Sequence, residues 1–205
     1  MHLPDVLREH RLLAVVRAGD PDAALESILV LAEAGVSLIE VPLTTPGGIG
    51  VIARARAELD SAVLLGAGRV ITVTDVVQVE QAGASFVVTP AVAPAVHETV
   101  RVGLPALVGA LTPSEVVSAM LAGASAVKMF PAALGGPGHL RLLCECFPDV
   151  AFVPAGGVDL AAVGDYLAAG AVAVGVGTAL LPEAPADDLE QLRARARAFL
   201  AAVGW

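Results

Sequence analysis

Lysine is almost absent from this chain: eleven of its twelve basic residues are arginines, and Lys128 is the only lysine. Cysteine is scarce as well, since only Cys144 and Cys146 occur, two positions apart in a segment with helical character. Residues two apart do not share a helix face, so the pair predicts neither a disulfide nor a metal pair. So few cysteines favour a reducing compartment, and we expect a cytoplasmic protein.

Positive charge is also in short supply, with a net charge of -9 and an isoelectric point near 4.8. Nucleic-acid binding needs clustered positive charge, so no nucleic-acid partner is expected. Hydrophobic residues make up 56% of the chain and mean hydropathy is +0.77. No run of about eighteen apolar residues lacks charge, glycine or proline, so no membrane span is expected. The first residues, Met1 to Asp5, also lack the apolar core of a signal peptide.

Short β-branched runs alternate with longer alanine-rich amphipathic runs, at a spacing of about 19 to 26 residues. Eight runs are predicted as strands, at 12–16, 37–41, 63–65, 85–89, 105–108, 125–129, 151–153 and 171–176. Strict alternation of strand and helix predicts a parallel sheet with right-handed crossovers. A chain of 205 residues then fits one α/β domain over 1–205, a small (β/α)8 TIM barrel with a short helix at 3–10 closing its bottom.

An open, doubly wound sheet is the rival architecture. It would carry a glycine-rich fingerprint after the first strand, and the segment Arg17-Ala18-Gly19-Asp20 is not one. Helix signals recur between the strands: Asp20 and Pro21 read as a cap and first helical residue, and Thr112 with Glu115 reads as a capping box.

Lys128 lies inside the predicted strand 125–129, where an ammonium group costs several kcal/mol to desolvate unless it is paired or neutral. A neutral lysine amine is a nucleophile, and burial is the usual way to favour that form. Strand side chains alternate between faces, so Lys128 and Glu40 both point into the barrel, from its sixth and second strands. Alternate strands fill the same layer of a barrel, so the two side chains are expected to meet near its axis. The alternative is a purely structural buried ion pair.

Further polar or special residues follow the other predicted strands. Active sites of such barrels gather at the carboxyl ends of the strands. We therefore expect site residues at Arg17 and Thr44, at Arg69, and around the cavity at Pro90, Phe130 and Thr112.

Glycines after the last two strands form a second candidate constellation. Gly156 and Gly157 are expected to precede a helix that starts at 158–159, and Gly177 with Thr178 adds N–H groups and a hydroxyl. The loops after strands seven and eight form the usual phosphate site of these barrels. Tight turning alone is the competing explanation.

The four histidines suggest no metal site, because none ends a strand and no two have ligand spacing. His2, His10 and His97 are interpreted as surface groups. His139 follows the strand that carries Lys128, so a ligand contact there stays open. No cofactor or metal is expected.

A neutral amine in a pocket attacks a ketone to give a carbinolamine and then an iminium, which is an electron sink. Glu40 can shuttle the protons of these steps. With a phosphate anchored across the barrel mouth, the residues predict a class I aldolase acting on a phosphorylated keto acid or keto sugar. Two alternatives remain: a sugar-phosphate isomerase or epimerase with Glu40 as its base, and a non-catalytic barrel that binds a phosphorylated metabolite.

The chain resembles the aldolases of 2-keto-3-deoxy-6-phosphogluconate (KDPG) and 4-hydroxy-2-oxoglutarate (KHG) over residues 12–181. The matching motifs are Glu40-Val41-Pro42-Leu43, Gly66-Ala67-Gly68, Val127-Lys128-Met129-Phe130-Pro131-Ala132 and Gly156-Gly157. The resemblance implies a homotrimer that cleaves its keto acid to pyruvate plus glyceraldehyde 3-phosphate, or to pyruvate plus glyoxylate.

The resemblance also implies residue roles. Lys128 matches the Schiff-base lysine and Glu40 the acid-base glutamate, while Gly156, Gly157 and Thr178 fall on phosphate-binding positions.

Two departures from the family pattern stand out. Thr44 occupies the position of an arginine that holds the pyruvyl carboxylate in many members, and Arg69 occupies that of a threonine. We therefore expect Arg69 to replace the missing clamp, or Arg17 to share or take that role. The segment from Glu40 to Pro46 leans toward the branch specific for the phosphogalactonate epimer, which also lacks the strand-two arginine.

Overall fold

The protein, described here by a computed structural model, forms a single parallel sheet of eight strands wrapped into a barrel. The structure describes residues 1–182 and 189–204. The strands follow the order β7-β6-β5-β4-β3-β2-β1-β8, and an isolated parallel bridge between Ala155 and Gly175 joins the two edges. The N–H of Val172 also donates to the carbonyl of Phe152 at 3.0 Å across that seam. The predicted (β/α)8 barrel is therefore confirmed.

The strands are short and closely match the predicted runs: β1 Leu12–Val15, β2 Leu38–Pro42, β3 Leu64–Gly68, β4 Phe86–Thr89, β5 Ala106–Ala110, β6 Ala126–Met129, β7 Phe152–Pro154 and β8 Val174–Val176. The largest differences are at β3, which extends three residues beyond 65, and at β8, which begins at Val174 rather than at 171. The end of β3 could not be predicted from β-branched residues, because Gly66 and Gly68 occupy it.

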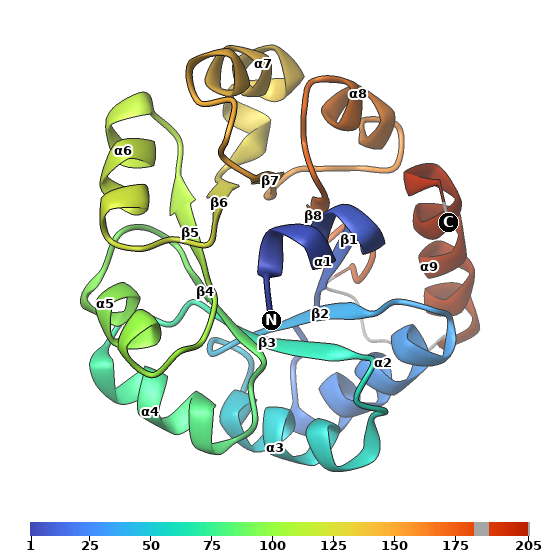
Figure 1. Ribbon diagram of the computed structural model, residues 1–205. Coiled ribbons are helices and arrows are strands. Elements are labelled where there is room, and N and C mark those ends of the chain that lie inside the picture. Colours follow the sequence, from blue (N-terminus) through green and yellow to red (C-terminus); the bar gives the residue numbers. More distant parts are fainter. Residues whose placement is uncertain (183–188, 205) are drawn as a thin grey trace.

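Helices α2 to α9 form an outer ring around the strands, and α1 lies across the centre of the barrel (Figure 1). The helices are α1 Leu3–His10, α2 Pro21–Glu33, α3 Gly48–Glu58, α4 Val73–Gln81, α5 Pro94–Arg101, α6 Pro113–Leu121, α7 Gly136–Cys146, α8 Val163–Ala168 and α9 Leu189–Val203, with a 3-10 turn η1 at Ala132–Leu134. Among the described residues, no helix has the length and apolar character needed to cross a membrane.

The predicted caps of α2 and α6 are present. Asp20 accepts hydrogen bonds from the N–H groups of Asp22 and Ala23 at the start of α2. At α6, Thr112 and Glu115 form a reciprocal capping box, in which each side chain accepts from the other residue's backbone N–H. Satisfied N–H groups at both helix starts fix where the chain leaves the preceding loops.

The predicted start of a helix at 158–159 is wrong, because α8 begins at Val163. The carboxylate of Asp159 instead accepts the N–H of Ala162 at 2.9 Å, which holds this stretch in a turn. Gly156 and Gly157 have φ values of 83° and 88°, a left-handed conformation that helical residues do not adopt. The two glycines therefore belong to an extended loop and not to a helix N-terminus.

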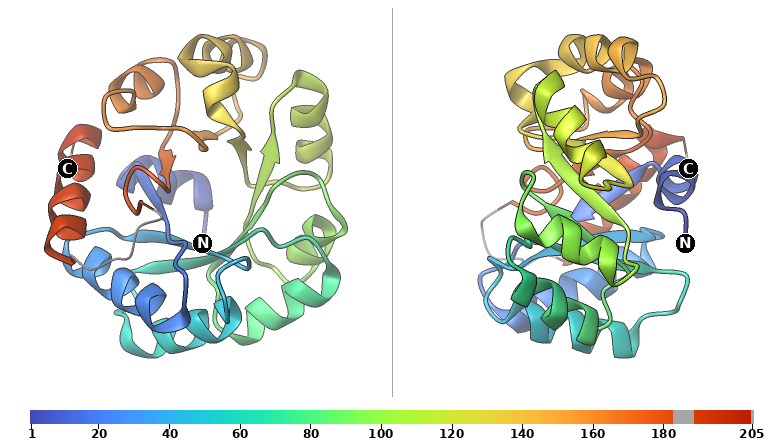
Figure 2. Two further views of the ribbon diagram at one scale, coloured as in Figure 1. Left: turned by 180° about the vertical axis from the view of Figure 1, so that it is seen from behind. Right: turned by 60° about the vertical axis from the view of Figure 1, so that its left-hand side comes forward.

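Helix α1 closes one end of the barrel. It crosses the near side of the barrel in Figure 1 and is remote from the end seen from behind in Figure 2, left. Leu3 and Leu7 are 1% exposed and pack with Leu13 and Phe86 in the barrel interior. The function of α1 as a plug for the bottom of the barrel agrees with the prediction.

The strands divide their side chains between two cores, as the alternation predicts. Ile39 and Val127 face the helices and belong to the outer hydrophobic cluster. Leu38 and Ala126 face inward and belong to the inner one. Each fully buried aliphatic side chain of this kind contributes about 1.5 to 3 kcal/mol. This pattern fixes the register that turns Lys128 and Glu40 inward.

Candidate active site

A large cavity opens at the carboxyl ends of the strands, opposite α1, with a volume of about 1030 Å³. Strands β1, β2, β4, β6 and β8 contribute residues to its wall, and the segments that follow β3 and β7 contribute the rest of the strand-end residues. The cavity is lined by these site residues predicted from the sequence: Arg17, Glu40, Arg69, Pro90, Lys128, Phe130, Gly156, Gly157, Gly177 and Thr178. Ten of the twelve predicted site residues are thus brought together at one mouth of the barrel.

Lys128 and Glu40 form a close pair at the floor of this cavity. The Nζ of Lys128 donates to Glu40 Oε2 at 3.2 Å and to Oε1 at 3.4 Å. The side chains are 11% and 2% exposed, so the contact is almost free of bulk water yet open toward the cavity. The ammonium also lies 5.6 Å from the centre of the Phe130 ring. The predicted meeting of the two side chains near the barrel axis is confirmed.

Two glycines of β3 make room for Glu40. In the sheet register Glu40 pairs with Gly66 and Pro42 pairs with Gly68. A Cβ on Gly68 would lie 2.7 Å from the Cδ of Glu40 and still closer to Oε1. The Glu40 carboxylate therefore packs directly on the backbone of Gly68, and no larger residue fits at that position without displacing it.

Two guanidinium groups face the cavity without a partner among the described residues. Arg17 follows β1 and Arg69 follows β3, and both side chains are exposed. Within residues 1–182 and 189–204, neither forms an ion pair or a hydrogen bond. Two unpaired cations in one cavity favour an anionic ligand.

The loops after β7 and β8 also line the cavity. The N–H groups of Gly156 and Gly157 donate to no backbone carbonyl of the described residues, so they are free to donate to a ligand. A Cβ on Gly156 would lie 2.7 Å from the Phe130 ring, and a Cβ on Gly157 would lie 2.5 Å from that of Ala133. Close packing against the segment after β6 is thus one reason for the two glycines, and anion binding is a second.

Thr44 and Thr112 are predicted site residues that do not line the cavity. Thr112 caps α6, and its hydroxyl donates to the Glu115 carboxylate at 2.9 Å. Three backbone and side-chain hydrogen bonds, first that from the N–H of Leu111, lower the pKa of Glu115. Thr44 is exposed in the loop that follows β2. The capping of α6 therefore explains the presence of Thr112, and no ligand contact is needed to explain it.

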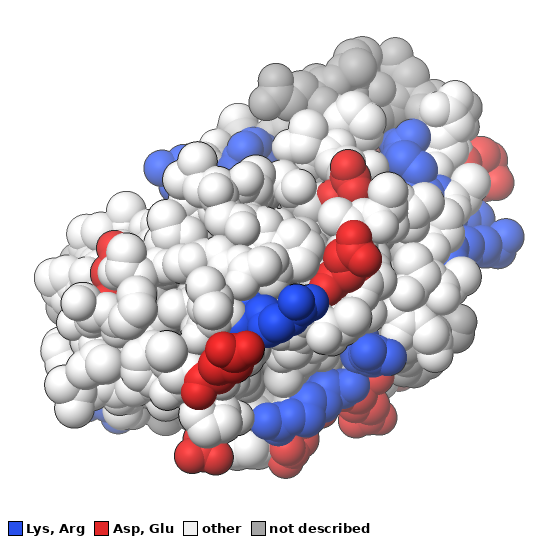
Figure 3. All heavy atoms as spheres, turned by 90° about the horizontal axis from the view of Figure 1, so that it is seen from above, with Lys and Arg blue, Asp and Glu red and all other residues white. Residues whose placement is uncertain are grey.

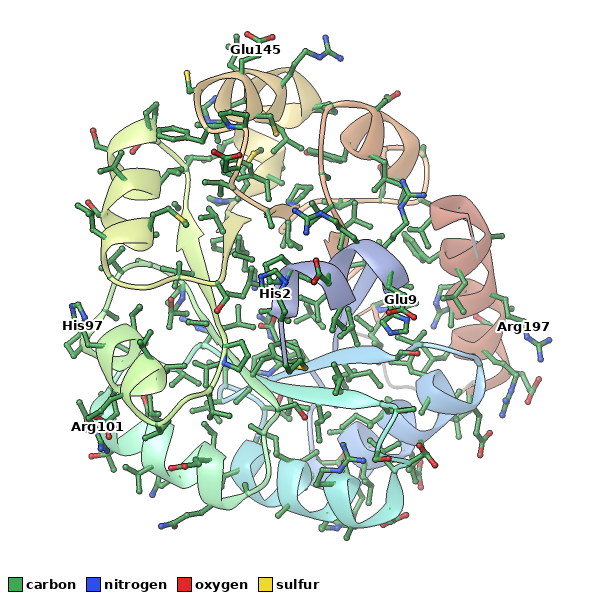
Figure 4. All side chains as sticks on the ribbon, viewed as in Figure 1. His2, Glu9, His97, Arg101, Glu145 and Arg197 are labelled. Carbon is green, nitrogen blue, oxygen red and sulfur yellow. The ribbon has the colours of Figure 1, made fainter. Side chains whose placement is uncertain are left out.

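The histidines lie away from the cavity wall. His2 is exposed and 2.8 Å from Asp5, and His97 points outward from α5 (Figure 4). His10 is partly exposed. His139 does not line the cavity either; its Nε2 lies 2.6 Å from the carbonyl oxygen of Leu111. In the part of the chain that the structure describes, no group of three or more candidate ligands could hold a metal.

Three acidic residues at the cavity rim were missed by the sequence analysis: Asp20, Glu26 and Asp159. Asp20 reads simply as a helix cap in the sequence, and nothing in the spacing of Glu26 points to the cavity. On the face shown in Figure 3, acidic and basic side chains are interleaved, with no continuous cationic area of the kind that nucleic-acid binding requires.

A (β/α)8 barrel whose only lysine meets a buried glutamate at the carboxyl ends of the strands has the architecture of a lysine-dependent, class I aldolase. The comparisons with known proteins make the assignment specific. The family model described as KDPG and KHG aldolase matches residues 3–194. The chain belongs to this family of lyases.

Relatives from both branches of the family are similar to the chain. A Pseudomonas aeruginosa protein named 2-dehydro-3-deoxy-phosphogluconate aldolase is 37% identical over 185 residues, covering 88% of this chain and 82% of its own. A Rhizobium meliloti (strain 1021) protein named "Probable 2-dehydro-3-deoxy-6-phosphogalactonate aldolase" is 34% identical over 197 residues, covering 95% and 92%.

The fold match extends to a solved structure with a trapped intermediate. The crystal structure of KDPG aldolase from Legionella pneumophila, with pyruvate captured as a covalent carbinolamine, has a TM-score of 0.83 and 25% identity. The match covers 98% of this chain and 95% of that one.

Proposed function

We propose that the protein cleaves a 2-keto-3-deoxy-6-phospho-sugar acid, of the phosphogluconate or phosphogalactonate type, to pyruvate and glyceraldehyde 3-phosphate through a Schiff base on Lys128. Cleavage of 4-hydroxy-2-oxoglutarate to pyruvate and glyoxylate is the proposed secondary activity. The observation that carries this proposal is the contact of 3.2 Å between Lys128 Nζ and Glu40 Oε2, almost free of bulk water at the floor of the cavity.

In the proposed first step, the ε-amine of Lys128 attacks the C2 carbonyl carbon of the keto acid and forms a carbinolamine. Transfer of the Lys128 proton to the Glu40 carboxylate would leave the amine neutral for this attack, and the pair is close enough for direct transfer. Glu40 then returns a proton to the carbinolamine hydroxyl, which leaves as water and gives the iminium. No metal enters any of these steps.

Carbon–carbon cleavage follows from the iminium. The C3–C4 bond breaks, and its electrons move to the iminium nitrogen to give an enamine. The C4 hydroxyl loses its proton to Glu40 and becomes the aldehyde. The enamine is then protonated at C3, and water hydrolyses the pyruvyl iminium to release pyruvate and the Lys128 amine.

The loops after β7 and β8 are proposed to hold the phosphate of the aldehyde half. The free N–H groups of Gly156 and Gly157, and the Thr178 hydroxyl with the Gly177 N–H, all line the cavity on that side. Anchoring the remote phosphate fixes the C3–C4 bond over Lys128, and correct orientation of this kind lowers the barrier of the chemical step.

We also place the protein in the cytoplasm as a homotrimer. Cys146 is an exposed free thiol, which suits a reducing compartment. Helices α5 and α6 expose apolar side chains at Val100, Val117, Met120 and Leu121, the last of them 83% exposed. An apolar surface of this kind supports burial against another copy of the chain. Light scattering after size exclusion should give three times the chain mass, and a smaller mass for Leu121→Glu.

The substrate proposal is tested by steady-state cleavage of three keto acids, with pyruvate release followed by a coupled dehydrogenase. The expected result is kcat/KM highest for one of the two phosphorylated epimers and lower for 4-hydroxy-2-oxoglutarate. Lys128→Met, checked for folding by circular dichroism, serves as the control and should release no pyruvate. Pyruvate release by that variant would contradict the Schiff base. Conversion of the keto acid to an isomer without pyruvate release, in the parent and in the variant alike, would favour an isomerase or epimerase with Glu40 as its base. Absence of turnover by the parent would favour a barrel that only binds its ligand.

A further inference from the structure

Backbone hydrogen bonds join the segment after β6 to the loop after β7. The N–H of Ala155 donates to the carbonyl of Met129 at 3.0 Å, in continuation of the β6–β7 pairing. The N–H of Ala132 in η1 donates to the carbonyl of Ala155 at 2.8 Å. The N–H of Ala133 donates to the carbonyl of Gly156 at 3.0 Å. The loop after β7 is therefore held in position by η1.

Side-chain packing reinforces this connection and extends it to the lysine. A Cβ on Gly157 would lie 2.5 Å from that of Ala133. A Cβ on Gly156 would lie 2.7 Å from the Phe130 ring, and the centre of the same ring lies 5.6 Å from Lys128 Nζ. The segment after β6 thus lies beside the lysine amine on one side and packs on the two glycines on the other.

Tyr166 of α8 is hydrogen-bonded to this segment from outside the barrel. It is the only tyrosine of the chain and is 2% exposed. Its hydroxyl donates to the carbonyl of Ala132 at 3.1 Å, across 34 positions of the sequence. Among the described residues, the N–H of Gly135 also donates to this carbonyl, at the longer distance of 3.3 Å. Tyr166 thus ties η1, and with it the loop after β7, to the helix layer.

Packing alone does not account for the hydroxyl of Tyr166. A phenylalanine would fill the same place in the outer hydrophobic cluster, and a buried hydroxyl is unfavourable unless it is hydrogen-bonded. Burial first, and then the negative charge of Asp159, raise the pKa of Tyr166. The phenol therefore keeps its proton, and its capacity to donate, in neutral and mildly alkaline solution. Its position and its protonation both suit a permanent hydrogen bond to Ala132.

We infer that Tyr166 is a positioning residue for the phosphate-binding loop: its hydroxyl acts through the carbonyl of Ala132 to hold Gly156 and Gly157 where they meet the phosphate of the substrate. The inference rests on the proposed function, since it takes these two glycines to bind that phosphate. Tyr166 does not line the cavity, so it touches no substrate itself. Lys128 is held independently, by the pairing of β6 with β5 and β7. Loss of the hydroxyl should therefore weaken the binding of phosphorylated substrates and spare the chemistry at Lys128.

The test compares the parent with Tyr166→Phe, which keeps the ring and removes the hydroxyl. KM and kcat are measured for the phosphorylated keto acid that the parent cleaves best, and the half-saturating pyruvate concentration is measured by borohydride trapping. Pyruvate carries no phosphate, so it reports on the Lys128 end of the cavity alone. Tyr166→Phe should raise KM by about three- to tenfold, the effect of one lost hydrogen bond, with kcat within about twofold. Its half-saturating pyruvate concentration should stay within about twofold of the parent value.

Thr99→Val is the matched control. Thr99 is fully buried, and its hydroxyl donates to the carbonyl of Ala95 within α5 at 2.7 Å. The variant therefore loses the same kind of hydrogen bond away from the cavity. Urea unfolding of both variants measures the cost in stability, and only Tyr166→Phe should change KM.

A KM within about twofold of the parent value in Tyr166→Phe would overturn the inference, and so would an equal rise in both variants. A parallel loss of affinity for pyruvate and for the phosphorylated keto acid would show a general effect on the barrel and would overturn it as well. Each of these results would leave the Schiff base intact. Absence of any adduct in the parent, or an adduct without cleavage of a phosphorylated keto acid, would instead remove the proposed function itself.

Discussion

Replacing Gly68 with alanine is the most direct perturbation of the proposed catalytic pair, Lys128 and Glu40, that leaves both of its members in place. The added Cβ would lie 2.7 Å from Glu40 Cδ and 2.8 Å from Cγ, whereas ordinary contacts begin at 3.4 Å. Glu40 is 1% exposed, so it can yield only by shifting within the barrel. A shift of about 1 Å in a catalytic group can lower the rate about a hundred-fold, which corresponds to about 2.7 kcal/mol in the activation barrier.

The assay is kcat for keto-acid cleavage, with thermal unfolding measured on the same preparations. Gly50→Ala is the matched control: Gly50 lies in α3, and a Cβ there would have no neighbour within 4 Å. We expect the control to keep full activity and to gain about 0.5 to 1 kcal/mol in the free energy of unfolding, since alanine is favoured over glycine inside a helix. If Gly68→Ala retained activity within about threefold of the parent, the position of Glu40 would not limit the reaction and the reasoning would be refuted.

Three further predictions concern stability. Lys128→Met leaves the Glu40 carboxylate buried without its partner and should lower the free energy of unfolding in urea by about 3 kcal/mol. The double variant Lys128→Met with Glu40→Leu should regain most of that loss. Equal stability of the single and the double variant would contradict a buried charged pair. Thr112→Ala should lower the free energy of unfolding by about 1 kcal/mol and leave kcat/KM unchanged, whereas a large loss of activity would place Thr112 back at the site. The backbone N–H of Leu111 lowers the pKa of Glu115 in the folded chain, so the stabilisation is present above the unfolded pKa and is lost as pH falls through the folded value. Glu115→Gln should therefore destabilise more at neutral pH than in acid, and an equal effect in both would speak against the capping carboxylate.

The barrel and the contact between Lys128 and Glu40 could be predicted because both follow from periodicity. Strand alternation alone turns Lys128 and Glu40 inward while their apolar neighbours face the helices, and strict alternation of strand and helix leaves few topologies. The predicted helix caps were equally local, since the side chains of Asp20 and Thr112 accept hydrogen bonds from N–H groups within three residues.

Features that depend on three-dimensional contacts could not be predicted from the sequence. The loop after β7 is held by the hydrogen bond from Ala162 to Asp159 and by close packing of Gly157 on Ala133, so the next helix starts five residues later than 158. The acidic rim is built from residues of α2 and of loops that no short spacing links. The role of Gly68 is visible only once β2 and β3 are in register.

Intact mass after incubation with pyruvate and borohydride tests the central claim most directly, with Lys128→Met treated in the same way. Lys128 is the only lysine of the chain, so an imine in the parent can form only at Lys128 or at the N-terminal amine. The account predicts one reduced pyruvyl adduct on the parent, located on Lys128 by peptide mapping, and none on the variant. No adduct on Lys128 in the parent would contradict the account, because the lysine would then be a structural partner of Glu40.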